Sequence, residues 1–94
     1  MSNTVKVYYK NSSWSNAYVH YKVNGTWTSV PGVKMKASDR SGYTWMYTID
    51  LGDTTSATLC FNNGNGSWDS KNGSNYTVGT GVYGISGNNT VKLN

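Results

Sequence analysis

Short runs that alternate apolar and polar residues are the feature that most limits how this chain can fold. Val5, Val7 and Tyr9 share one face of such a run over Val5–Lys10, and Tyr43–Leu51 alternates in the same way. Gly and Asn residues end the runs, and no long window spaces its apolar residues as a helix does. The pattern predicts an all-β chain of short antiparallel strands, folded as a sandwich or a barrel.

The same pattern predicts the other strands and a single domain. Further strand-like segments cover residues 17–23, 26–30, 33–36, 57–61, 76–78, 83–85 and 90–93, and residues 62–75 are expected to form a long Asn/Gly/Ser loop. The 94 residues suit one domain, and no internal repeat or linker divides them. We therefore expect one module over residues 1–94, with residues 1–3 as an added or disordered start.

The composition favours a neutral, hydroxyl-rich ligand. Charged residues make up 13% of the chain, Glu is absent, and Asn, Ser, Thr and Gly supply most of the polarity. The net charge is +4, but the eight basic residues are scattered and include one Arg, whereas a nucleic-acid binder clusters such residues. No nucleic-acid partner is therefore expected. No membrane partner is expected either, since no signal peptide, membrane-spanning run or lipidation motif is visible.

Residues for catalysis or metal binding are scarce. Hydrolysis of a glycosidic bond usually needs two carboxylates, and the chain offers only Asp39, Asp50, Asp53 and Asp69. Asp69 has no evident partner in the sequence. Cys60 is the one cysteine, so it forms no internal disulfide and has no cysteine companions for a metal. We expect no catalytic residue, no metal site and no cofactor.

The dipeptide Asn24-Gly25 predicts the geometry of one hairpin. A two-residue type I′ loop there places Lys22 opposite Trp27, and Trp27 then shares a face with His20 and Tyr18. His20 and Trp27 become diagonal neighbours, about 7–8 Å apart at the backbone. An indole can stack on the C–H face of a sugar while an imidazole bonds a hydroxyl. The alternative is that Trp27 packs under a neighbouring loop, because tryptophan is usually buried.

Trp68 is the one large apolar residue in the expected loop over residues 62–75. It either closes the core as a lid or stands exposed for a ligand. We favour the ligand, because functional residues concentrate on loops. Most of the surrounding Asn side chains are expected to form Asx turns, with one or two reaching ligand hydroxyls.

Three segments resemble carbohydrate-binding module family 25, a starch-binding family. The segment FNNGNGSWDSKNGSNY, at residues 61–76, resembles the family signature FNDG-x-x-x-WD-N-N-x-G-x-NY. The stretches V-x-V-Y-Y-K and Y-V-H-Y-x-x-x-G-x-W-T-x-x-P-G-V-K-M are similar to the same family, and the three matches together span roughly residues 4–78. The chain departs from the pattern at Asn63, where Asp is usual, and at Ser70-Lys71, where Asn-Asn is usual.

The resemblance implies an immunoglobulin-like β-sandwich attached to extracellular amylases that attack raw starch. It also implies a ligand site of one histidine and two tryptophans, which fall here on His20, Trp27 and Trp68. The implied partners are starch, amylose and malto-oligosaccharides, together with a covalently linked glycoside hydrolase. The module is expected to be secreted and to act as a monomer.

Tyr18, Lys71 and Asn72 are expected to be secondary contacts of the same site. Two other functions stay open at this point. A module for a flat β-glucan such as cellulose would hold its rings coplanar, whereas tilted rings would suit starch. A structural immunoglobulin-like spacer without a ligand would bury both Trp27 and Trp68.

Overall fold

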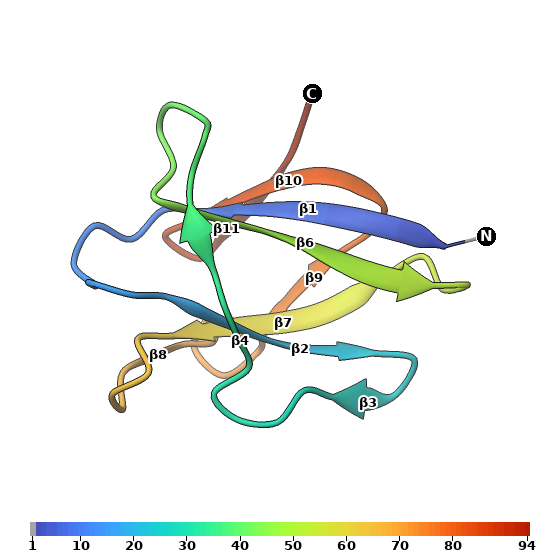
Figure 1. Ribbon diagram of the computed structural model, residues 1–94, viewed down its shortest axis with the longest axis horizontal. Helices are drawn as coiled ribbons and strands as arrows, with labels where there is room; N and C mark the ends of the chain where they lie inside the picture. The colour runs from blue at the N-terminus through green and yellow to red at the C-terminus, as the bar shows by residue number, and fades with distance from the viewer. Residues whose placement is uncertain (1) are drawn as a thin grey trace.

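Two β-sheets stacked face to face make up the computed structural model, which describes residues 2–94 (Figure 1). Residues 2–94 contain no helix, and hence no helix that could span a membrane. The prediction of an all-β sandwich is confirmed. Of the start expected at residues 1–3, Met1 lies outside the described residues, and the first strand begins at Asn3.

The five-stranded sheet has the order β11-β10-β1-β6-β5. Its strands are β1 (Asn3–Tyr9), β5 (Lys36–Ala37), β6 (Trp45–Gly52), β10 (Gly81–Ser86) and β11 (Asn89–Leu93). Strands β1 and β10 run parallel, and the other neighbours in this sheet run antiparallel. The expected antiparallel arrangement therefore holds except for this one pair.

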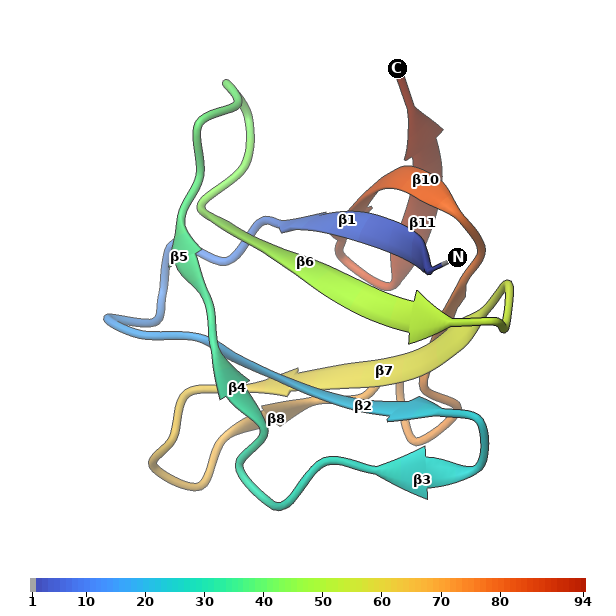
Figure 2. The same cartoon turned by 45° about the vertical axis from the view of Figure 1, so that its right-hand side comes forward.

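The six-stranded sheet has the order β3-β2-β7-β8, with β4 also paired to β2 and β9 to β7. Its strands are β2 (Tyr18–Val23), β3 (Thr26–Trp27), β4 (Val33–Lys34), β7 (Ala57–Asn62), β8 (Trp68–Asp69) and β9 (Tyr76–Val78). All pairs in it are antiparallel. Between β4 and β5 the chain crosses from this sheet to the other, and Met35 is buried at the crossing (Figure 2).

Alternate residues of the facing strands fill the space between the sheets. Tyr9 from β1 stacks on Phe61 from β7, with ring centroids 3.8 Å apart and ring planes 4° apart. A ring of one sheet therefore packs directly on a ring of the other. Tyr76 packs against Phe61 at 5.7 Å. All three rings are almost fully buried. Burying a large apolar side chain contributes about 1.5–3 kcal/mol, so this trio is a main source of cohesion between the sheets.

Two tyrosines depart from the alternation read from the sequence. Tyr8 lies on the outer face of β1 yet is buried, because the Tyr43 ring packs on it at 5.8 Å. The run over Tyr43–Leu51 predicts Tyr43 on the same face as Trp45, but β6 starts only at Trp45. Tyr43 therefore turns to the outer face and covers Gly84, where a Cβ atom would overlap the phenol ring.

Candidate functional site

The hairpin between β2 and β3 has the predicted register, with Lys22 opposite Trp27. Asn24 and Gly25 have φ values of 52° and 80°, the left-handed conformations that a type I′ turn requires. This register puts the Trp27 side chain on the outer face of the six-stranded sheet, where it is 38% exposed. The alternative of an indole packed beneath a loop is therefore wrong for Trp27.

Trp68 reaches the same face from strand β8, where the sequence pattern predicted only loop. Asn62 at the end of β7 pairs with Trp68 on one side and with Tyr18 on the other. Directly paired residues point to the same face of a sheet, so Trp68 joins the outward-facing residues of β2. The indole is 46% exposed. A strand of two residues is too short to leave an alternating pattern in the sequence.

The imidazole of His20 lies between the two indoles. Its ring centroid is 4.8 Å from that of Trp27, with planes 22° apart, and 5.8 Å from that of Trp68, with planes 75° apart. The two indole planes are therefore inclined to each other by at least the difference of those angles, about 53°. The fold thus brings the three residues His20, Trp27 and Trp68 into one contiguous surface, which we call the aromatic shelf below.

The aromatic shelf carries a neutral imidazole at pH 7. Partial burial holds the pKa of His20 below its usual value of 6.5. His20 Nδ1 lies 2.8 Å from Thr28 Oγ1, which orients the ring. The Lys22 ammonium lies 5.5 Å from the Trp27 ring centroid, a cation–π distance, and adds one hydrogen-bond donor beside the indole. The shelf can therefore offer stacking surface and neutral or cationic hydrogen-bond groups.

Asp69 ties the strand that carries Trp68 to the core. Its Oδ2 accepts a hydrogen bond of 2.6 Å from the Tyr9 hydroxyl, and its Oδ1 accepts one of 2.8 Å from Tyr76. The backbone N–H of Lys71 donates to the same Oδ1 at 3.3 Å. Asp69 is thus bonded to phenols of the core, and no second carboxylate is among its hydrogen-bond partners in residues 2–94. The Tyr9 contact spans 60 positions of sequence, so it becomes visible only once the sheets are packed.

Burial of the Tyr9 and Tyr76 phenols should make the stability of the domain depend on pH in the alkaline range. Burial, assisted by the hydrogen bond to Asp69, raises the pKa of both Tyr9 and Tyr76 far above the ordinary value of 10.0. Their contribution to stability is therefore fully present below pH 10 and is lost as the pH rises above 10, because the unfolded chain then ionises and the native one does not.

We expect at least two of the eight tyrosines to stay protonated until the domain unfolds. Tyrosinate absorbance followed alongside circular dichroism measures both events. Reversible ionisation of all eight tyrosines in the native domain would contradict the burial and bonding described for Tyr9 and Tyr76.

A left-handed turn follows Trp68-Asp69. Lys71, Asn72 and Gly73 have φ values of 54°, 56° and 90°, and the backbone N–H groups of Gly73 and Asn75 both donate to Ser70 O. Asn tolerates this conformation better than Lys does, which is a physical reason for an Asn preference at such a turn. Within residues 2–94 the exposed side chains of Lys71 and Asn72 make no hydrogen bond, so both are free to meet a ligand.

Tyr18 lies on the outer face at the start of β2, next to the loop that precedes Trp68. A Cβ atom on Gly64 would come within 2.6 Å of the Tyr18 ring, so the loop backbone lies directly against that ring. Asn62 holds the start of this loop, since its Oδ1 accepts from Gly64 N at 2.8 Å and its Nδ2 donates to Pro31 O at 2.8 Å. Tyr18 is thus partly covered and supports the loop.

The sequence of this chain matches that of a known protein family over its full length. The sequence profile described as "Carbohydrate binding domain (family 25)" matches residues 1–94 of the chain. The chain belongs to carbohydrate-binding family 25. The resemblance noted in the sequence is therefore confirmed over its whole length.

Relatives of this family-25 domain include much longer proteins. An alpha-amylase of Niallia circulans is 50% identical over 91 residues, covering 95% of this chain and 7% of the relative. A beta/alpha-amylase of Paenibacillus polymyxa is 43% identical over 82 residues, covering 86% of this chain and 7% of the relative. The domain therefore spans only a small part of the curated amylases that it matches.

Solved structures of the same family share the fold. The iodinated CBM25 of a Bacillus halodurans amylase in complex with maltotetraose is similar with a TM-score of 0.87 and 32% identity, over 97% of both chains. The CBM25-2 of the Paenibacillus polymyxa beta/alpha-amylase is similar with a TM-score of 0.81 and 37% identity, over 100% of this chain and 95% of that one.

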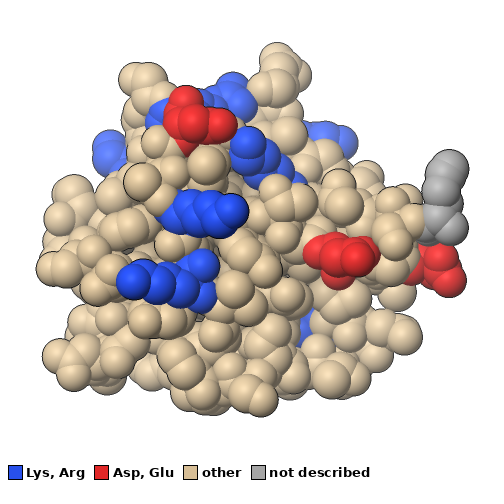
Figure 3. Space-filling model, in the orientation of Figure 1, with Lys and Arg blue, Asp and Glu red and all other residues tan. Residues whose placement is uncertain are grey.

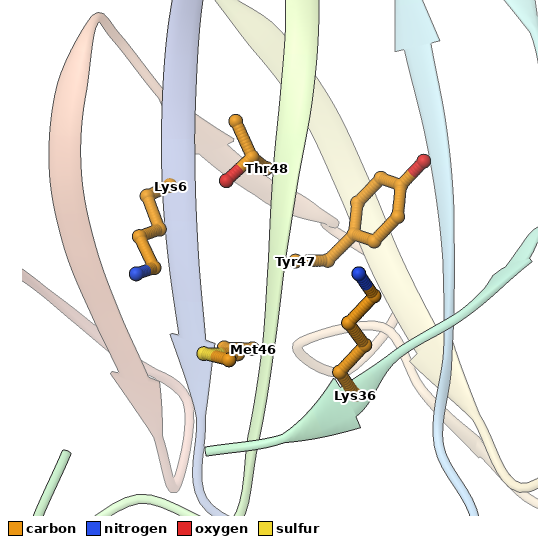
Figure 4. Close-up of a pocket in the computed structure, with 5 residues that line it drawn as sticks. All are labelled: Lys6, Lys36, Met46, Tyr47 and Thr48. Carbon is orange, nitrogen blue, oxygen red and sulfur yellow. The ribbon is translucent and has the colours of Figure 1, made fainter. Parts of the chain in front are cut away.

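A hollow on the other sheet of the family-25 domain has a different character. It has a volume of about 210 Å³ and is lined by Lys6, Lys36, Met46, Tyr47 and Thr48 of β1, β5 and β6 (Figure 4). Two ammonium groups at its rim suit an anion better than a neutral sugar, and it lies away from the aromatic shelf. Basic side chains are scattered over the upper and middle parts of the face shown in Figure 3, with uncharged surface and an acidic patch among them.

Proposed function

We propose that this family-25 domain binds α-1,4-glucans through the aromatic shelf. Trp27 and Trp68 stack on glucose rings of one chain, and His20 bonds a hydroxyl between them. The observation that supports this most strongly is the inclination of two exposed indoles by at least about 53° around a neutral imidazole. A helically curved α-glucan turns its successive rings, so two tilted platforms fit it and two coplanar ones do not.

The solved relatives support the same ligand class. The Bacillus halodurans domain was solved in complex with maltotetraose, and it matches this chain over 97% of both lengths. We infer that starch, amylose and malto-oligosaccharides are the partners of this domain. Lys71 and Asn72 on the left-handed turn, and Tyr18 beside the loop, make secondary contacts to the same chain.

The amylases among the relatives support a targeting role. Because the domain covers 7% to 14% of those proteins, we infer that it is one module of a secreted glycoside hydrolase. We further propose that the module acts as a monomer. Its role is to keep the linked catalytic domain on granular starch. Linking a second glucan-binding module would raise the avidity for the granule without any new contact.

We infer that the module itself is not catalytic. Both carboxylate oxygens of Asp69, the carboxylate next to Trp68, accept hydrogen bonds from structural phenols. Asp39 is likewise engaged, since it accepts from the Tyr8 hydroxyl at 2.7 Å and lies 3.5 Å from the Lys6 ammonium. A glycosidase needs one carboxyl group to donate a proton and a second to act as base or nucleophile.

The two alternative functions fit the geometry less well. A β-glucan module needs coplanar rings, whereas the indole planes here are steeply inclined. A structural spacer needs both indoles buried, whereas Trp27 and Trp68 are 38% and 46% exposed. Measuring the binding of α- and β-linked glucose oligosaccharides distinguishes both alternatives from the proposed function.

Titration with maltoheptaose and with a cello-oligosaccharide of the same length tests the proposed function. We expect maltoheptaose to bind with a Kd of about 10 μM to 1 mM, as is typical of a site with few contacts, and to shift the indole fluorescence. The cello-oligosaccharide should bind at least about tenfold more weakly, a difference of about 1.4 kcal/mol. Affinity should change little with salt, because a neutral ligand releases no counterions.

Equal or tighter binding of the cello-oligosaccharide would favour the β-glucan module. If neither sugar produced a calorimetric or fluorescence response, the structural spacer would be favoured. A steep loss of binding to single-stranded DNA with rising salt, together with no response to maltoheptaose, would point to a nucleic-acid binder instead.

A further inference from the structure

Thr28 is bonded to both His20 and the backbone of β2, although sequence analysis assigned it no role. Its backbone N–H donates to Tyr21 O at 2.9 Å, which continues the hairpin pairing one residue beyond β3. Its Oγ1 accepts a hydrogen bond of 3.2 Å from Tyr21 N and lies 2.8 Å from His20 Nδ1. Thr28 is therefore bonded to the Tyr21 backbone twice, once through its own N–H and once through its hydroxyl, and these bonds hold the hydroxyl against the imidazole.

Counting hydrogens favours the Thr28 hydroxyl as the donor in the Thr28–His20 bond. A threonine hydroxyl has one hydrogen and two acceptor lone pairs, and Tyr21 N–H occupies one lone pair. If the hydroxyl donates to His20 Nδ1, its hydrogen and that nitrogen are both satisfied within the protein. If Nδ1–H donates instead, the hydroxyl hydrogen has no acceptor among residues 2–94. The first arrangement therefore leaves neither the Thr28 hydroxyl nor His20 Nδ1 without a partner, and it leaves His20 Nε2 as the one ring nitrogen without a bond among residues 2–94.

The ring environment of His20 agrees with the first arrangement. The imidazole is held between Trp27, stacked at 4.8 Å, and Trp68, edge-on at 5.8 Å, so the ring has little freedom to flip. Partial burial lowers the pKa of His20, which keeps the ring neutral at pH 7. A neutral imidazole whose Nδ1 accepts carries its proton on Nε2.

We propose that Thr28 is a positioning residue that holds His20 in the Nε2–H tautomer, so that the aromatic shelf presents a hydrogen-bond donor to the glucan. The inference rests on the proposed function for its ligand. His20 then recognises an oxygen of the sugar that accepts a hydrogen bond. This oxygen is a hydroxyl oxygen, a ring oxygen or a glycosidic oxygen. Thr28 touches no ligand itself, and it acts through the imidazole.

Nitrogen NMR of the free domain tests the tautomer directly, because His20 is the one histidine in the chain and its ring signals need no assignment among several. We expect a protonated Nε2 and an unprotonated Nδ1 in the unmodified domain at neutral pH. Thr28→Val keeps the shape and removes the hydroxyl, so it should show a mixture of both tautomers. Thr28→Ser restores a hydroxyl and should restore the single tautomer.

Binding of maltoheptaose supplies the second readout. We expect Thr28→Val to lower the affinity about three- to tenfold, the loss that one weakened hydrogen bond produces, and Thr28→Ser to recover most of it. In a His20→Ala background the further change Thr28→Val should have almost no effect, because Thr28 acts only through His20. A merely structural role would lower the affinity in both backgrounds alike.

Several results would overturn the proposal. They are a protonated Nδ1 in the unmodified domain, an unchanged tautomer in Thr28→Val, no recovery in Thr28→Ser, and an equal loss of affinity in the His20→Ala background. Failure of the unmodified domain to bind maltoheptaose would instead reject the proposed function. The tautomer of the free domain is measured without sugar, so the two failures are distinguishable.

Discussion

Replacing Trp68 with alanine is expected to lower the affinity of the domain for maltoheptaose by at least about 30-fold, since a stacked aromatic ring contributes about 2 kcal/mol or more. The indole is 46% exposed, so its loss removes ligand contact area and little of the core. Trp27→Ala should act in the same way, and it also removes the ring on which His20 is stacked. The double variant should show no measurable binding by isothermal titration calorimetry.

Val91→Ala is a matched control for this experiment. Val91 is an exposed apolar residue, 53% accessible, on strand β11 of the other sheet. We expect it to leave the affinity unchanged, and circular dichroism should show a native fold for all the variants. An affinity of Trp68→Ala within about twofold of the unmodified domain would remove that indole from the proposed site, since twofold is only about 0.4 kcal/mol.

Asp69→Ala should be the most destabilising change near the aromatic shelf, with a loss of about 3–5 kcal/mol in the free energy of unfolding. Two buried phenols, Tyr9 and Tyr76, would each lose a hydrogen bond to a carboxylate oxygen. Hydrogen bonds to charged groups contribute about 1.5–3 kcal/mol each. Because Asp69 follows Trp68 in β8, the variant should also bind maltoheptaose more weakly where it is still folded.

Urea denaturation measures this loss, and Asp53→Ala is its control. Asp53 is exposed in the turn after β6, so its removal should change the unfolding free energy by less than about 0.5 kcal/mol. Combining Asp69→Ala with Tyr9→Phe and Tyr76→Phe should recover part of the stability, because no buried hydroxyl is then left without a partner. Equal stability of Asp69→Ala and Asp53→Ala would show that the two phenol bonds contribute nothing.

Local features of this chain were predictable because they depend on neighbours in the sequence. Alternation over residues such as Val5, Val7 and Tyr9 indicates which side chains face the core. Asn24-Gly25 sets the hairpin register, since a type I′ turn matches the strand twist with both residues at positive φ. That register is enough to place His20 and Trp27 on one face of the hairpin.

Contacts between residues far apart in the sequence were decided only by the three-dimensional packing. Trp68 reaches His20 only because β8 pairs with β7, and the two residues of β8 are too few to show an alternating pattern. The bond from Tyr9 to Asp69 links positions 60 residues apart, so nothing in the local sequence marks it.

The chain by itself thus determined most of its β-strands, one hairpin face and its family. Tertiary structure alone decided the tilt of the two indoles and the anchoring of the second one. The physical reason is that strand pattern and turn type depend on adjacent residues, whereas ring orientation and buried hydrogen bonds depend on groups that meet only after the two sheets close.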